Sequence, residues 1–331
     1  RRLPIAHTRQ SKLRGVSRAE RTDDPFLAAP SVKGRGLAFL RFLGFVVLSI
    51  VLAVGTCFLL AWLLVEFAVI DATTRTVPVE VAMALQVASQ SFGALAATAL
   101  MAWVGGRSLR EFGWSGDRRR RRLLIGIATG FALMALLLVV LHFASVFTVD
   151  RANPVDAQTL VSGALYGLLM IAVAVSEESL FRGYALTALA QSISFWPAAV
   201  TMSILFALAH ALNPGETVAG MVSVAVFGLV LAYSYRRTGS LWFAVGLHGS
   251  WDYAESFVFG VPNSGIVMSG SLLNSEFHGP TWLTGGSAGP EGSLLVPVVL
   301  LAIPLIVSTL WRGDGEAGAA ESTLTMPTLS G

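Results

Sequence analysis

The sequence predicts an all-α, polytopic membrane protein with about eight transmembrane helices and both termini in the cytoplasm. Composition, the number of long apolar blocks and the distribution of basic residues predict this fold class. Of the 331 residues, 54% are apolar and 13% are charged, whereas soluble domains carry about 25% charged residues. The mean hydropathy of +0.68 excludes both a soluble globular chain and a disordered one.

Eight apolar blocks are long enough to cross a membrane core of about 30 Å, which takes about 20 helical residues. Their ranges are 40–69, 80–105, 123–148, 160–191, 195–212, 217–235, 240–260 and 293–311. We expect a basic cytoplasmic tail at 1–36, a transmembrane domain at 37–312 and a disordered C-terminal tail at 313–331. The segment 261–292 is expected to be a long external loop.

Basic residues predict the orientation of these spans. Twenty of the 23 Lys and Arg residues lie in the tail or in loops on one predicted side, and only Arg75 and Arg151 lie on the other. Such an excess marks the cytoplasmic side. We expect the run Arg118–Arg122 to contact membrane lipid rather than nucleic acid. The distribution therefore predicts a multi-pass protein with cytoplasmic termini.

Ionisable residues inside the spans are costly and mark candidate functional sites. They occur in the fourth, fifth and seventh blocks: Glu177, Glu178, Arg182, His210, His248 and Asp252. Glu178 and Arg182 are four residues apart, a spacing that favours an ion pair on one helix face. His248 and Asp252 have the same spacing, and Glu177 is rotated by about 100° from Glu178, so it can face another helix.

The depths of these residues predict that they meet. Glu177 and His210 each lie about 24 Å along the helix from the turn near 192–194, while His248 and Asp252 lie about 12 and 18 Å into their span. Three helices are therefore expected to bring acids and imidazoles into one layer, reached from the cytoplasmic half.

Two chemistries fit such a cluster. A glutamate in a pocket of low dielectric can act as a general base, with histidines positioning a water molecule and stabilising an oxyanion. Alternatively, His210, His248 and Asp252 could hold Zn²⁺ with one open position. Both predict an activated water that attacks a carbonyl, and the sequence leaves the cofactor question open between zinc and a metal-free mechanism.

The motifs that carry these residues resemble those of the CAAX-protease and bacteriocin-processing (CPBP) family, which includes type II CAAX prenyl endopeptidases. The family pattern EExxxR, FxxxH and HxxxN or HxxxD is similar to Glu177–Arg182, Phe206–His210 and His248–Asp252 here. The resemblance covers about 160–260. Each motif alone is weak, but the three in order on separate spans are specific.

This resemblance implies a role for each matching position. Glu177 would activate the water, His210 would position it, and His248 with Asp252 would steady the oxyanion or bind a metal. Glu178, Arg182 and Phe206 would support the site. The eukaryotic enzymes have Asn at the position of Asp252. An ionised Asp cannot donate a hydrogen bond. We therefore expect Asp252 to orient His248 or to bind a metal rather than to donate to the oxyanion.

The sequence therefore predicts an intramembrane endopeptidase whose partner is a hydrophobic or lipid-modified peptide, in what we take to be a prokaryotic plasma membrane. Two other classes of protein could carry the same residues. A proton-coupled transporter also uses buried Glu and His, but transporters usually carry internal repeats, and 40–148 has no counterpart of the ionisable cluster. A catalytically silent scaffold or immunity protein would tolerate Glu177→Gln.

Overall fold

The computed structural model describes residues 32–67, 77–115, 118–211, 213 and 215–311. The predicted C-terminal tail, Arg75 and most of the predicted N-terminal tail lie outside these residues. The first helix begins at Val32, so the start of the helical region falls inside the range predicted as a tail.

The chain is mostly helical, as the composition predicts. In order, the elements of the first half are α1 Val32–Glu66, α2 Val79–Val104, η1 Leu109–Phe112, α3 Arg119–Phe143, β1 Phe147–Ala152, α4 Ala157–Glu178, η2 Ser179–Gly183 and α5 Tyr184–Ile193. Those of the second half are α6 Phe195–His210, α7 Val218–Thr238, α8 Trp242–Tyr253, η3 Ala254–Phe259, β2 Leu273–Phe277, α9 Thr281–Thr284, η4 Gly286–Ala288, η5 Pro290–Gly292, α10 Val296–Leu300 and α11 Ala302–Leu310.

Each of the eight predicted blocks contains helix. Among the described residues, five helical stretches are long and apolar enough to cross a membrane: α1, α2, α3, the continuous α4–η2–α5 stretch, and α7. The other blocks hold shorter helices, namely α6, α8 with η3, and α10 with α11. The structure thus shows a mostly helical bundle with five candidate spans among its described residues, and eight spans stay a prediction.

A small sheet departs from the all-α prediction. β1 and β2 pair antiparallel, with Phe147 opposite Phe277 and a register shift between Val149 and Arg151. The apolar end of α3 runs into Phe147 without a break in hydropathy, so block 123–148 was expected to stay helical. Phe147 instead packs its ring against Phe277, at 5.4 Å between centroids. This pairing ties the segment after α3 to the long loop 261–292.

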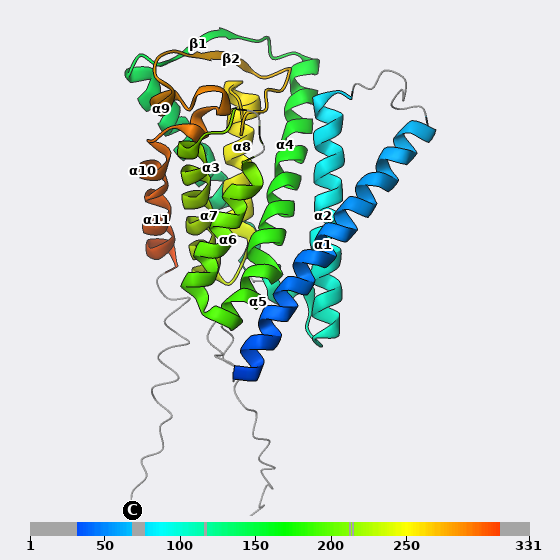
Figure 1. Ribbon diagram of the computed structural model, residues 1–331. Helices are drawn as coiled ribbons and strands as arrows, with labels where there is room; N and C mark the ends of the chain where they lie inside the picture. The colour runs from blue at the N-terminus through cyan, green and yellow to red at the C-terminus, as the bar shows by residue number, and fades with distance from the viewer. Residues whose placement is uncertain (1–31, 68–76, 116–117, 212, 214, 312–331) are drawn as a thin grey trace, which may run out of the picture.

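Two ends of the bundle can be distinguished (Figure 1). At one end, which we call the basic end, Arg236 lies over the ring of Phe195 at the start of α6, and Arg237 donates to the carbonyl of Trp311 after α11. The start of α1 and the end of α11 also lie at this end (Figure 1). β1, β2 and α9 lie at the opposite end, which we call the sheet end (Figure 1).

Glycines allow α3 and α8 to pack backbone against backbone. A Cβ at Gly126 would lie 2.3 Å from the carbonyl oxygen of Phe243, and one at Gly130 would lie 2.1 Å from that of Leu247. Small residues at helix contacts permit such close approach in membranes. This contact sets the position of α8, and it places the residue after Leu247 near the middle of α3.

Candidate active site

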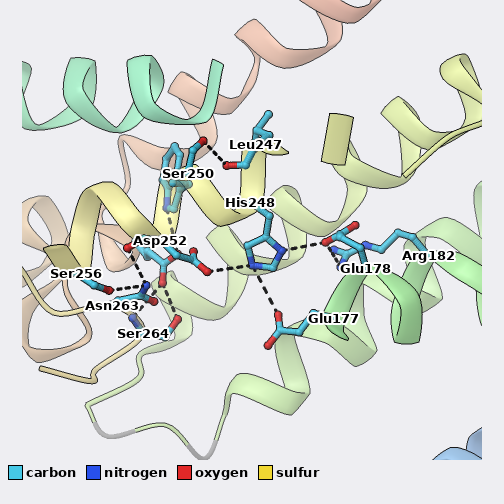
Figure 2. A network of polar contacts seen from close by, with 12 residues as sticks. Glu177, Glu178, Arg182, Leu247, His248, Ser250, Asp252, Ser256, Asn263 and Ser264 are labelled. Atoms are coloured by element: carbon cyan, nitrogen blue, oxygen red, sulfur yellow. Dashed lines mark hydrogen bonds and ion pairs between the residues drawn. The ribbon is translucent and has the colours of Figure 1, made fainter. Parts of the chain in front are cut away.

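The site is built where the end of α4 meets α8. Glu178 is the last residue of α4, and its Oε1 accepts hydrogen bonds from Arg182 (3.1 Å) and from Nδ1 of His248 (3.0 Å). The exposed fractions of these three residues are 0%, 1% and 5%. The ion pair between Glu178 and Arg182 is the one that their spacing predicts. Figure 2 shows His248 enclosed by carboxylates from two helices.

Glu177 faces the other side of the same imidazole. Nε2 of His248 lies 3.7 Å from Oε2 of Glu177 and 3.6 Å from Oδ2 of Asp252. Both distances are too long for hydrogen bonds and short enough for strong electrostatic interaction. Glu177 thus points toward α8, as its rotation from Glu178 predicts. His248 sits between one hydrogen-bonded carboxylate and two others.

A π-helical turn follows the two glutamates directly. η2 spans Ser179–Gly183 and continues into α5. Inserted π-turns occur frequently at functional sites because they shift the register of the side chains beyond them. Here the turn keeps Arg182 on the side of Glu178, with its guanidinium 4.1 Å from the ring centre of Phe206.

His210 and Phe206 come from α6. Nδ1 of His210 lies 2.8 Å from the carbonyl oxygen of Phe206. Since a carbonyl oxygen only accepts, Nδ1 carries the proton, and in the neutral ring Nε2 is left as an acceptor. The ring of Phe206 meets the edge of His210 at 4.7 Å and that of His248 at 6.2 Å. Phe206 therefore contacts both imidazoles.

Glu177, His210, His248 and Asp252 line one cavity of about 190 Å³. The structure therefore brings all four predicted catalytic residues to a common space. A cavity of this size has room for several water molecules. A water molecule can therefore bind between the carboxylate and the imidazole rings.

The cavity extends from these residues toward the sheet end. Its further lining residues come from the first half of α2, from the loop after η3, and from η5: Met83, Gln86, Val87, Gln90, Asn263, Ser264, Ile266 and Glu291. No Lys or Arg is among its described lining residues. The cavity therefore lies toward the end of the bundle opposite the basic end, and access from the cytoplasmic half stays a prediction. Helix depth alone does not reveal which space neighbouring helices leave open.

The predicted zinc ligands do not converge as a metal site. Among the described residues, the His, Cys, Asp and Glu side chains with three ligand atoms within 4.8 Å of one another are Asp252, Glu255 and Glu291. His210 and His248 are not part of that group. The geometry therefore does not support a zinc ion held by His210, His248 and Asp252. The contacts of His248 with Glu177 and Glu178 support the hypothesis that a glutamate activates the water.

Several polar residues of the cavity region were missed from the sequence. Glu255 lies within the block 240–260 and could have been found as a further ionisable residue in a span. Gln86 and Gln90 are polar residues four apart in an apolar helix, and this spacing could likewise have marked them as candidate site residues. Glu291 lies in a glycine-rich segment without periodicity, so no local pattern could place it.

Glu216 lies between α6 and α7, close enough to His210 and Glu291 to interact electrostatically. Burial raises the pKa of Glu216, and the hydrogen bond from the backbone N–H of Thr217 (2.8 Å) offsets part of this effect. A carboxyl group that gains a proton easily therefore lies near the cavity.

The chain was compared with known families. The family described as type II CAAX prenyl endopeptidase Rce1-like matches residues 162–254, which include all three motifs from Glu177 to Asp252. Searches of curated proteins and of solved structures found no match.

Proposed function

We propose that this chain, whose residues 162–254 match the family of type II CAAX prenyl endopeptidases described as Rce1-like, is an intramembrane endopeptidase that uses a glutamate-activated water. The observation that carries this proposal is the pairing of Glu177 with His248, 3.7 Å apart at the wall of a cavity that His210 also lines.

In this mechanism Glu177 accepts a proton from water as the water oxygen attacks the carbonyl carbon of the peptide bond. Nε2 of His210, left as an acceptor by the bond at Nδ1, holds the second hydrogen of that water. When the tetrahedral intermediate collapses and the C–N bond breaks, Glu177 returns the proton to the leaving amine. General base catalysis of this kind contributes about 100- to 10,000-fold.

His248 is suited to stabilising the oxyanion. When the ring carries two protons, both nitrogens are donors. Nδ1–H is then engaged by Glu178, and Nε2–H can donate to the carbonyl oxygen, with the carboxylate of Asp252 3.6 Å from Nε2. Glu178 and Arg182 act through His248 and are positioning residues. Asp252 takes no donor role in this scheme, in keeping with the chemistry of a carboxylate.

The shape of the site supports a hydrophobic substrate. The cavity wall combines the catalytic groups with apolar side chains such as Leu180, Phe181 and Val224, which suits a peptide that is apolar or carries a lipid. We propose that the protein lies in a prokaryotic plasma membrane. Its basic end would face the cytoplasm, because Lys and Arg residues mark the cytoplasmic side. The substrate then approaches from within the membrane or from the non-cytoplasmic side, which favours an apolar peptide segment over a cytoplasmic prenylated C-terminus.

The test is a cleavage assay with the purified full chain in lipid nanodiscs. The probes are a library of hydrophobic peptides and a farnesylated CAAX-type peptide, and mass spectrometry identifies new termini. We expect internal cleavage of apolar peptides by the wild-type chain. Absence of any new terminus, together with proton flux in proteoliposomes, would favour a transporter, while absence of both would favour a silent scaffold.

A further inference from the structure

Three acidic side chains meet beside the candidate active site. One carboxylate oxygen each from Asp252, Glu255 and Glu291 lies within 4.8 Å of the other two. Asp252 and Glu255 are 4% and 0% exposed, and Glu291 is half-buried. Three carboxylates in so small and dry a space repel one another strongly unless something of positive charge lies between them.

The carboxylate of Glu255 has no hydrogen-bond or ion-pair partner among the described residues. Both of its carboxylate oxygens are buried and make no hydrogen bond to any described residue. No described Lys or Arg forms an ion pair with Asp252, Glu255 or Glu291. Buried carboxylates are normally hydrogen-bonded, paired or bound to a metal. The orphaned group of Glu255 points into the cluster, so it is an observation separate from the clustering itself.

Glu291 is held in place by donors. Its Oε1 accepts from Nε1 of Trp251 (3.2 Å), and its Oε2 accepts from the backbone N–H (3.1 Å) and the hydroxyl (2.6 Å) of Ser264. Three donors match a carboxylate that acts only as an acceptor. These hydrogen bonds hold the carboxylate of Glu291, which comes from η5, against α8. The position of this carboxylate in the cluster is therefore fixed by the fold.

We propose that Asp252, Glu255 and Glu291 bind a divalent cation, with Ca²⁺ as the preferred ion. Carboxylate oxygens are the ligands that hard cations take. Ca²⁺ bonds oxygen at about 2.4 Å, so three oxygens that lie within 4.8 Å of one another can share one ion. Ca²⁺ also accepts several carboxylates in a flexible geometry, whereas Mg²⁺ demands a near-ideal octahedron and usually binds through one or two carboxylates.

Water can complete the coordination shell, because Asp252 and Glu291 also line the 190 Å³ cavity. The ion would tie α8 and η3 to η5, and so fix one of the segments that line the cavity. This role goes beyond the proposed hydrolysis and does not depend on it, since the cation would bind whether or not the cavity cleaves peptides.

The experiment is calorimetric titration of the purified, chelator-treated and desalted full chain with CaCl₂, alongside MgCl₂. We expect saturable binding of one Ca²⁺, and a melting temperature that rises with Ca²⁺ because a ligand of the native state stabilises it. Glu255→Gln should weaken binding by about tenfold or more. Glu276→Gln, at an exposed acid of β2, is the matched control and should leave the affinity unchanged.

A second measurement needs no variant. Tb³⁺ resembles Ca²⁺ in size and ligand preference and emits when a nearby indole is excited. The indole of Trp251 donates a hydrogen bond to Glu291, so an ion at this site lies close to it. Sensitised Tb³⁺ emission that Ca²⁺ abolishes would support the site even if Glu255→Gln does not fold. Absence of saturable Ca²⁺ binding by the wild-type chain would overturn the proposal in favour of carboxyls that share protons. Equal affinity in a folded Glu255→Gln variant would overturn it as well.

Discussion

Nδ1 of His248 donates to Oε1 of Glu178 across the interface of α8 and α4, at 3.0 Å. The same oxygen accepts from Arg182, so one carboxylate oxygen fixes both an imidazole and a guanidinium. The side of the ring that bears Nε2 is consequently turned to the cavity, where Glu177 and Asp252 lie. The orientation of the proposed oxyanion donor thus depends on a buried ion pair that touches no substrate.

Loss of Arg182 should destabilise the fold as well as the site. Arg182→Met leaves Glu178 buried without its guanidinium, and breaking a buried pair costs about 3–5 kcal/mol. We expect a lower melting temperature in detergent. The double variant Glu178→Gln/Arg182→Met should be less destabilised than Arg182→Met alone, because no unpaired carboxylate is left. A double variant that is as unstable as the sum of both single variants would contradict this view of the pair.

The contact between α3 and α8 should tolerate no side chain at Gly130. An alanine Cβ there would lie 2.1 Å from the carbonyl oxygen of Leu247, and overpacking costs about 1–3 kcal/mol. Gly130→Ala should therefore lower the melting temperature and, by moving His248, the cleavage rate. Gly55→Ala in α1 is the control, because a Cβ there meets nothing within 4 Å. Equal behaviour of the two variants would show that this helix contact does not position the site.

The stability of the protein should fall as Glu216 ionises. Burial raises the pKa of Glu216 above its ordinary value of 4.5, so the folded state holds this proton to higher pH than the unfolded state does. Between those two pKa values the free energy of unfolding decreases as the pH rises. Melting temperatures measured from pH 4.5 upward should show this decrease in the wild-type chain and a flatter profile in Glu216→Gln. Parallel profiles would rule out Glu216 as the cause.

The orientation can be tested with single cysteines. Cys57 is the only cysteine, so Cys57→Ser gives a clean background. Ser287 in η4 and Ser115 after η1 are both exposed and lie in segments expected on opposite sides of the membrane. On intact cells, a membrane-impermeant maleimide should label Ser287→Cys, and it should label Ser115→Cys only after permeabilisation. The reverse pattern would place the mouth of the cavity on the cytoplasmic side.

The contacts that the sequence could predict are those within one helix. Residues four apart share a helix face, and this spacing alone pairs Glu178 with Arg182 and His248 with Asp252. Depths along the helices placed Glu177 level with His210 and His248 about 12 Å nearer the cytoplasmic side. The contact between Glu177 and His248 was therefore expected only in the sense that three helices share one layer. For the fold, long apolar blocks predicted where helices form, because a span must bury its backbone polar groups in helix.

The remaining features depend on contacts that no local pattern records. The pairing of β1 with β2 joins segments more than a hundred residues apart, and hydropathy continues from α3 into β1 without a signal. Glu291 reaches the site only because Trp251 and Ser264 hold it there. The direction in which the cavity extends depends on the space that α2 and the loop 261–292 leave open. Depths measured along single helices contain no information about that space.

The most direct test of the central claim is the cleavage rate of Glu177→Gln against that of the wild-type chain in nanodiscs, on the first peptide found to be cut. The amide keeps the size of the side chain and cannot accept a proton from water. We predict a loss of about 100- to 10,000-fold with an unchanged melting temperature, while Glu276→Gln cleaves normally. A Glu177→Gln variant that cleaves at the wild-type rate would contradict the account, because the hydrolytic water would then be activated without Glu177.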